Sequence, residues 1–176
     1  MANGKKKGNK GEREVANWFK KWTGYDFTRI PASGGLRWKN VKDTVGDIIC
    51  TDDKHSGRFP FSVESKKYKE IEILPCIIGQ KANTLTFWEQ AKDDGDRGGK
   101  EPILFMRYNN MKRDTYFVVV NEDIGKWILK HLNHKIDNYI MKLTSNEQKF
   151  YLMSSELLMK VDYKEIYKFI RKKLKG

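Results

Sequence analysis

Apolar positions near the start of the chain follow a helical period. Between residues 15 and 22, valine, tryptophan and phenylalanine recur at three- and four-residue spacing, which predicts an amphipathic helix. Asn9 is a favourable N-cap residue and Glu12 follows it by three positions, so we expect this helix to begin near Asn9 and to end at Gly24. Glu12 lies at the margin of the apolar face, where it is either a capping group or a metal ligand.

Short extended segments follow, each bounded by turn-forming residues. Strands are expected at residues 25–30, 46–50, 61–66, 102–108 and 115–120. Further helices are expected from Thr84 or Thr86 to Lys92 and from Asn121 or Asp123 onward, with a loop at residues 93–100 between them. Beyond residue 135 the pattern predicts a helix to about Leu143, a short strand at 150–153 and a last helix that begins at Asp162.

Residues 46–66 carry the strongest candidate chemistry. Two apolar runs separated by turn formers predict a β-hairpin. Because side chains alternate along a strand, Glu64 and Lys66 share one face, and the hairpin would bring Asp47 beside them. Two carboxylates and an ammonium group at the end of an apolar ribbon are costly to hold together without a cation.

This set of groups suits metal-assisted hydrolysis of a phosphodiester. Asp47 and Glu64 offer the hard oxygen ligands that Mg²⁺ prefers, and a bound metal lowers the pKa of its water and offsets charge on the phosphate. Lys66 would orient that water or stabilise charge in the transition state. The alternative is an ordinary hairpin whose charged residues are solvated or form one ion pair, and the short pattern alone does not decide between the two.

The charge of the chain indicates a polyanionic partner. The 176 residues include 35 lysines and arginines against 23 aspartates and glutamates, a formal net charge of +12. Nucleic acid is therefore the leading partner, with an anionic membrane surface as the lesser alternative. We expect no membrane span and no secretory signal, and Cys50 and Cys76 are interpreted as buried free thiols. These features predict an intracellular, cytoplasmic protein, or one of the host cytoplasm if the source is viral.

Two basic segments lie outside the hairpin. Residues 31–35 form a loop with two glycines whose backbone N–H groups could approach a phosphate, or an ordinary surface turn among solvated charges. The last helix has an apolar stripe and an opposite face rich in lysine. That face is either solvated or in contact with phosphates.

The motifs together resemble those of the archaeal-type Hjc Holliday junction resolvases, a family also found in phages, within the PD-(D/E)XK nuclease superfamily. Residues 7–15 are similar to the family's K-G-x-x-x-E-R-E-hydrophobic opening, Arg29 with residues 33–35 to its R…S-G loop, residues 46–49 to its D-I-I segment, and residues 63–66 to its E-x-K motif. The likeness covers about the first two thirds of the chain. A glycine, Gly46, stands where the superfamily signature has proline.

The resemblance implies an α/β fold with a restriction-endonuclease-like core, in which helices flank a mixed central β-sheet. The nuclease core is expected at residues 9–125, after a flexible basic N-terminus at residues 1–8. Residues 126–176 are expected to form a mainly helical C-terminal extension that packs on the core.

The resemblance also implies a set of site residues. Glu12, Asp47, Glu64 and Lys66 would form the catalytic group, with Ser33 in support. Mg²⁺, for which Mn²⁺ would substitute, would be held by Asp47, Glu64 and the carbonyl of Ser65, and Glu12 would hold a second metal or its water. The residues expected to contact DNA are Lys5, Lys6, Lys7, Lys10, Arg13, Arg29, Ser33, Gly34, Arg37, Lys39, Lys67 and Gln90.

The function that the resemblance implies is a Mg²⁺-dependent endonuclease that resolves four-way DNA junctions by paired symmetric nicks. Branched DNA would be its partner, and two symmetric nicks imply a homodimer. One alternative is another PD-(D/E)XK nuclease, of restriction or repair type, that acts on duplex, flap or single-stranded DNA. A second alternative is a non-catalytic DNA-binding module, but such a module gains nothing from carboxylates that face phosphates.

Overall fold

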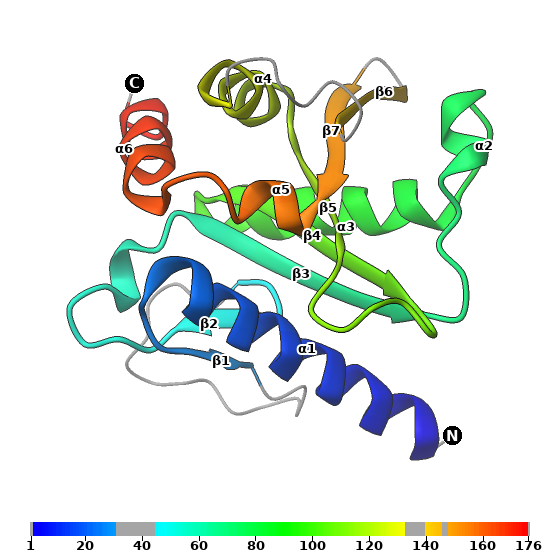
Figure 1. Cartoon of the computed structure of the whole chain (residues 1–176), viewed down its shortest axis with the longest axis horizontal. Coiled ribbons are helices and arrows are strands. Elements are labelled where there is room, and N and C mark those ends of the chain that lie inside the picture. The colour runs from blue at the N-terminus through cyan, green and yellow to red at the C-terminus, as the bar shows by residue number, and fades with distance from the viewer. Residues whose placement is uncertain (1, 31–44, 133–139, 146–147, 176) are drawn as a thin grey trace.

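The computed structural model describes residues 2–30, 45–132, 140–145 and 148–175, and within them one mixed β-sheet of seven strands is flanked by helices (Figure 1). The strands are β1 (Phe27–Arg29), β2 (Ile48–Cys50), β3 (Phe61–Tyr68), β4 (Glu101–Tyr108), β5 (Phe117–Asn121), β6 (Ile140–Ser145) and β7 (Gln148–Ser154). The helices are α1 (Ala2–Thr23), α2 (Leu74–Ile77), α3 (Asn83–Gly98), α4 (Glu122–His131), α5 (Ser155–Leu158) and α6 (Tyr163–Lys173), with a 3-10 turn η1 at Ser56–Arg58. The expected α/β class with a restriction-endonuclease-like core is confirmed.

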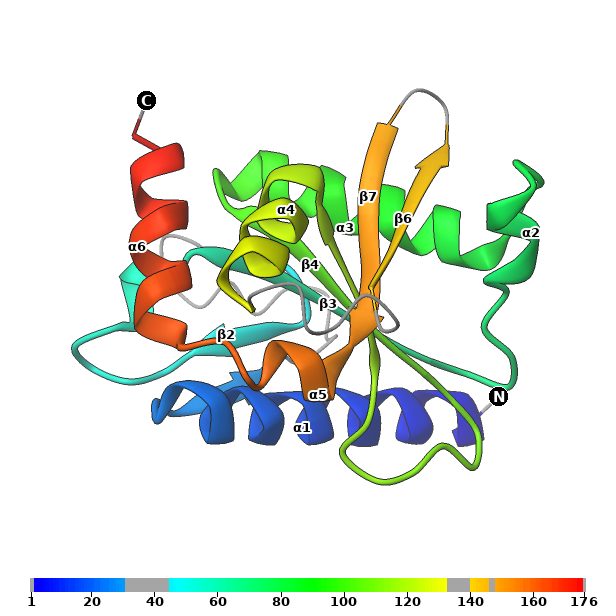
Figure 2. The same ribbon diagram turned by 45° about the horizontal axis from the view of Figure 1, so that its top comes forward.

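The strand order is β1-β2-β3-β4-β5-β7-β6, and β3 and β4 are the parallel pair among antiparallel neighbours. A parallel pair needs a crossover connection, which α2 and α3 supply. Side chains of β4 alternate between two apolar clusters, so that Ile103 and Phe105 lie with α1 while Leu104 and Met106 lie with α3. Figure 2 shows α1 and α3 on opposite sides of the central strands.

The apolar stripe of α1 packs against the sheet as its period predicts. Val15, Trp18, Phe19 and Trp22 are all buried, and the Trp22 indole Nε1 donates a hydrogen bond to the Val161 carbonyl at 2.8 Å. The predicted start of this helix near Asn9 is wrong, because the helix is continuous from Ala2 and includes most of the basic segment at residues 1–8. Lysine is a good helix former, so the lysines of this segment can extend the helix rather than separate from it.

The loop expected at residues 93–100 is also wrong for most of its length, because α3 continues to Gly98. Gly95 is buried in the helix. A Cβ atom there would lie 2.8 Å from the Lys100 carbonyl oxygen, so the close packing at this position requires glycine. Gly99, in the left-handed conformation at φ 60°, then ends the helix. The glycines therefore serve close packing and capping rather than a flexible turn.

The C-terminal segment is less helical than expected. The predicted strand at 150–153 is confirmed as part of β7, but residues 140–143, expected to be helical, belong to β6. These strands continue the sheet, since β7 pairs with β5. The last helix, α6, begins as predicted, with the Asp162 carboxylate accepting a hydrogen bond from the Lys164 N–H at 2.7 Å. None of the described helices is both long and apolar enough to cross a membrane.

Candidate active site

The β2–β3 hairpin places Asp47 against the middle of β3. Ile48 pairs with Val63, and the Asp47 N–H donates to the Val63 carbonyl at 2.7 Å. The Asp47 carboxylate then accepts a hydrogen bond through Oδ2 from the Ser65 N–H at 2.9 Å. Its other oxygen, Oδ1, accepts no hydrogen bond from a described residue, so it remains available to a ligand.

Gly46 makes this approach of the two strands possible. Its φ of +78° belongs to the left-handed region that favours glycine. A Cβ atom at this position would lie 2.5 Å from the Val63 carbonyl oxygen and 2.9 Å from the Val63 nitrogen, which is closer than such atoms can pack. This geometry favours a glycine at the position where the superfamily signature carries proline.

Glu64 and Lys66 project from β3 toward the same face, as the alternation predicted. Glu64 is buried, with 2% of its surface exposed, and Lys66 Nζ lies 2.5 Å from its Oε1. The ammonium group of Lys66 therefore balances the charge of this buried carboxylate. Lys66 also lies 5.6 Å from the centre of the Phe87 ring, which limits the directions open to its ammonium group.

Burial sets the ionisation of both carboxyl groups. It raises the pKa of Glu64 to about 7; the charge of Asp47 adds to this shift, while Lys66 opposes it. The pKa of Asp47 is also raised by burial, although the hydrogen bond from Ser65 acts in the opposite direction. Two carboxylates that resist ionisation side by side form an environment that an added cation would stabilise.

Glu12 joins this pair from α1. Its negative charge contributes to the raised pKa of both Asp47 and Glu64, so the structure brings the three predicted acids into electrostatic contact. The Glu12 carboxylate is held by Arg29, whose Nη1 lies 3.1 Å from Oε2 and 3.2 Å from Asn9 Oδ1. Asn9, expected as the N-cap, instead helps to fix Arg29.

The donor set fits a hard divalent cation held by two carboxylates. Within the described part of the chain, no group of three or more histidine, cysteine, aspartate and glutamate side chains is arranged as a metal cluster. Asp47 and Glu64 nevertheless place two hard oxygen ligands side by side, and Mg²⁺ commonly uses one or two carboxylates with substrate phosphate oxygens completing its shell. Besides burial, the charges of Asp47 and Glu12 raise the pKa of Glu64 although Lys66 opposes them, and this excess of negative charge is the observation that favours such an ion.

The predicted DNA-contact residues have different positions in the structure. Lys10 and Arg13 are exposed on α1 and Gln90 is exposed on α3. Lys67 forms an ion pair with Glu14, and Arg29 forms one with Glu12. Lys5, Lys6 and Lys7 lie within α1, but their side chains are outside the described part. The predictions for Ser33, Gly34, Arg37 and Lys39 fall outside the described residues.

An ionic cluster beside the site was missed by the sequence interpretation. Glu14 Oε2 lies 3.2 Å from both Lys67 Nζ and Arg107 Nη1. Arg107 is buried in β4, and its Nη2 donates a hydrogen bond to the Met111 carbonyl at 2.9 Å. An arginine at the end of an otherwise apolar strand was the available signal, since buried arginines are rare unless paired.

Comparisons with known proteins agree with this geometry. A family model described as "Phage putative PDDEXK endonuclease" matches residues 3–168. The chain is 24% identical over 127 residues to Protein D14 of Escherichia phage T5, and that alignment covers 71% of this chain and 68% of the phage T5 protein. No solved structure matches the chain. Since the family model spans nearly all of the sequence, the chain belongs to this phage family of PD-(D/E)XK endonucleases.

Proposed function

We propose that this PD-(D/E)XK endonuclease resolves four-way DNA junctions by paired symmetric nicks. The observation that supports cleavage is the pair of carboxylates, the buried Glu64 and the half-buried Asp47, beside the ammonium group of Lys66. The junction as substrate is supported by the resemblance of residues 7–66 to the resolvase motifs.

The proposed metal ligands are Asp47, Glu64 and the carbonyl of Ser65, and Mg²⁺ is the proposed ion, with Mn²⁺ as a substitute. When bound, the ion lowers the pKa of a water molecule and offsets charge on the scissile phosphate. Glu12 would hold a second metal or its water, and the contact with Arg29 keeps its carboxylate oriented toward the site.

Lys66 has the proposed role of positioning the attacking water. Its ammonium group contacts the Glu64 carboxylate and the ring of Phe87, and these contacts restrict the position of the nitrogen that carries its three N–H donors. A fixed positive charge next to the phosphate also stabilises charge that develops in the transition state. Ser33 is proposed to support this group from the segment outside the described residues.

Paired nicks require two active sites related by two-fold symmetry, which a homodimer supplies. Leu74 and Ile77 on α2 and Ile78 just after it are 75%, 50% and 69% exposed, and these apolar side chains are a candidate for this interface. Junction recognition would rest on backbone charge and shape, so the affinity should fall steeply with salt.

Cleavage of a labelled synthetic four-way junction beside a matched linear duplex tests the proposal. We expect paired symmetric nicks in the junction alone, with Mg²⁺ present, and no nicks with EDTA or in Asp47→Asn. Asp93→Asn, an exposed aspartate on α3, is the matched control and should cut normally. Equal cutting of the duplex would favour the general nuclease, and junction binding without cutting under any divalent metal would favour a non-catalytic module.

A further inference from the structure

A groove that the proposed active site does not use lies between α6 and the segment that connects β2 to β3. Its aromatic end is a cavity of about 340 Å³, in the lower part of the range of roughly 300–1,000 Å³ typical of ligand pockets. The side chains that define this end are Tyr25, His55, Tyr163 and Tyr167. A second hollow of about 530 Å³ shares Arg58, Tyr167 and Lys168 with the first, so the two form one groove, here named the α6 groove.

The aromatic end holds its rings in fixed positions. The Tyr25 and His55 rings stack with centroids 3.8 Å apart and an interplanar angle of 12°. His55 Nδ1 lies 2.7 Å from the Asp52 carboxylate, and the Tyr163 ring meets Tyr25 edge-on at 5.6 Å. Tyr25, His55 and Tyr167 all remain partly exposed. The rings are therefore anchored from behind and present partly open surfaces, an arrangement on which nucleic-acid bases stack.

The cationic end of the groove follows α6. Its members are Arg58, Lys164, Lys168, Arg171, Lys172 and Lys175. Lys168 is paired with Glu165 at 2.7 Å, whereas the other members form no ion pair with a described residue. Among the described residues that line the two hollows, none is an aspartate or glutamate. The uncompensated charge attracts a polyanion along the helix.

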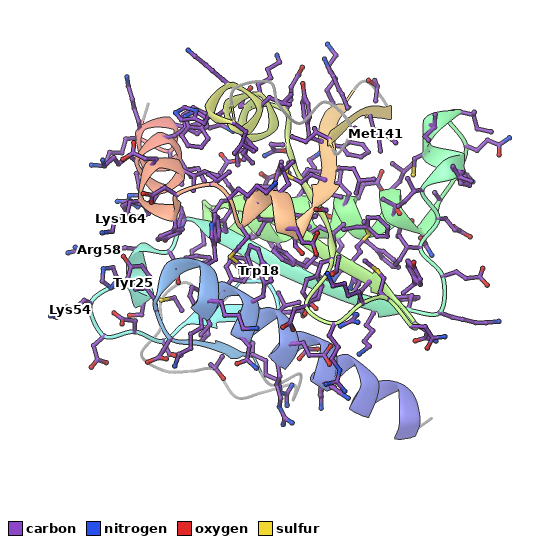
Figure 3. The ribbon with its side chains drawn as sticks, viewed as in Figure 1. Trp18, Tyr25, Lys54, Arg58, Met141 and Lys164 are labelled. Atoms are coloured by element: carbon purple, nitrogen blue, oxygen red, sulfur yellow. The ribbon has the colours of Figure 1, made fainter. Side chains whose placement is uncertain are left out.

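The α6 groove lies away from the proposed catalytic group. Tyr25 follows the C-terminal end of α1, whereas Glu12 lies near the middle of that helix. Figure 3 places Tyr25, Lys54, Arg58 and Lys164 together at the left-hand edge of the molecule, beneath α6. A ligand in the groove would therefore contact the protein at a second place, apart from Asp47, Glu64 and Lys66.

We propose that the α6 groove binds an unpaired stretch of DNA, with bases on its tyrosine and histidine rings and phosphates along α6. The inference rests on the proposed function only in taking DNA as the ligand. A duplex keeps its bases stacked on each other and would use the cations alone. An anionic lipid surface would likewise leave the recessed rings without a role, so the combination favours unpaired nucleotides.

A matched pair of triple variants tests the cationic end. The groove variant is Arg58→Gln/Lys164→Gln/Lys172→Gln, and the control variant is Lys81→Gln/Lys130→Gln/Lys149→Gln, which removes the same charge from exposed positions elsewhere. Binding of a fluorescein-labelled oligothymidine to the full-length protein is followed by anisotropy in EDTA, so that no cutting occurs. We expect the groove variant to bind at least tenfold more weakly, while the affinity of the control variant changes less than about twofold. The slope of log affinity against log salt concentration should also fall in magnitude by about 2, because each of the three lost phosphate contacts contributes roughly 0.7.

The aromatic end is tested with an abasic oligonucleotide of the same length. The wild type should bind oligothymidine about tenfold more tightly than the abasic strand, and His55→Ala/Tyr167→Leu should lose most of this preference, with circular dichroism confirming its fold. Equal weakening in the groove and control variants, or equal affinity for thymidine and abasic strands, would overturn the inference. It would also be overturned if the groove variant lost binding to phosphatidylserine vesicles but kept its affinity for the oligonucleotide.

These measurements are independent of the junction-cleavage test. Because binding is measured in EDTA, the result does not depend on whether the protein cuts junctions, duplexes or neither. A protein that cuts junctions while its groove variant binds single strands normally would retain the proposed function and lose this inference. A protein that cuts no junctions, but whose groove variant binds single strands more weakly, would retain this inference and lose the proposed function.

Discussion

Glu64 is the proposed metal ligand whose ionisation is shifted furthest, with a pKa raised to about 7. Its folded-state pKa of about 7 lies above the ordinary value of 4.5, so the folded chain binds this proton more tightly than the unfolded chain does. Between these two values the free energy of unfolding must fall as the pH rises. In EDTA we expect a loss on the order of 2–3 kcal/mol between pH 4.5 and pH 7.5, measured by urea denaturation at each pH.

Two comparisons identify Glu64 as the source of this loss. Glu64→Gln should flatten the pH dependence, leaving the smaller contribution of Asp47, whose pKa is also raised. Mg²⁺ binds the ionised carboxylates, so it should raise the melting temperature more at pH 8 than at pH 5. A stability that rises with pH through this window in EDTA would contradict the raised pKa of Glu64.

Gly46 gives a second prediction at the residue scale. In Gly46→Ala the new methyl group meets the Val63 carbonyl and the backbone stays at positive φ. We expect a loss of at least about 2 kcal/mol in the free energy of unfolding, and slower DNA cleavage because Asp47 is displaced. Gly57→Ala is the control, because no atom lies within 4 Å of its added Cβ, and it should change stability by less than about 0.5 kcal/mol.

The positions of Asp47, Glu64 and Lys66 were predictable because they depend on short-range rules. Alternation along β3 fixes the face that Glu64 and Lys66 share, and the hairpin register brings Asp47 to them. The partner of Glu14 was not predictable in the same way. Arg107 is far away in the sequence and reaches Glu14 only because β3 and β4 are adjacent in the finished sheet.

At the scale of elements, the Glu14 cluster fixes α1 to the sheet. Glu14 bridges Lys67 on β3 and Arg107 on β4, and the buried guanidinium has few other partners. In Glu14→Gln we expect a loss of about 2 kcal/mol in the free energy of unfolding, less than for a fully buried pair because Glu14 is partly exposed. Glu89→Gln, at an exposed glutamate of α3, should stay within about 0.5 kcal/mol by the same urea titration. Equal effects in the two variants would mean that the Glu14 cluster adds nothing to helix docking.

The elements that the sequence predicted well are those with a clear apolar period. β4 and β5 were expected within a few residues, and α6 begins after its predicted cap at Asp162. One error arose at residues 93–100, where a segment with three glycines was expected to be a loop. In α3, Lys100 and Pro102 pack closely against Gly95, which is a tertiary constraint that a local pattern does not contain.

At the scale of the whole molecule, residues 126–176 complete the structure that the predicted nuclease core begins. β7 pairs with β5 along its length, and α4 spans the expected boundary after residue 125. Ile166 and Ile170 of α6 belong to the same apolar cluster as the buried face of α1. The division at residue 125 came from where the family resemblance ends, which carries no information about where the core is complete.

A chain that ends at residue 125 is therefore expected not to fold cooperatively. It would leave β5 as an exposed edge strand, cut α4 within its first turns and uncover the apolar face that α6 covers. The cooperativity of unfolding is measured by thermal melting, followed by near- and far-ultraviolet circular dichroism. A chain that ends at Leu174 is the control, because it loses only two residues, of which Lys175 is exposed, and should melt as the full chain does. A sharp transition in the shorter chain would show instead that residues 1–125 are an independent domain, with the C-terminal strands added to a core that is already stable.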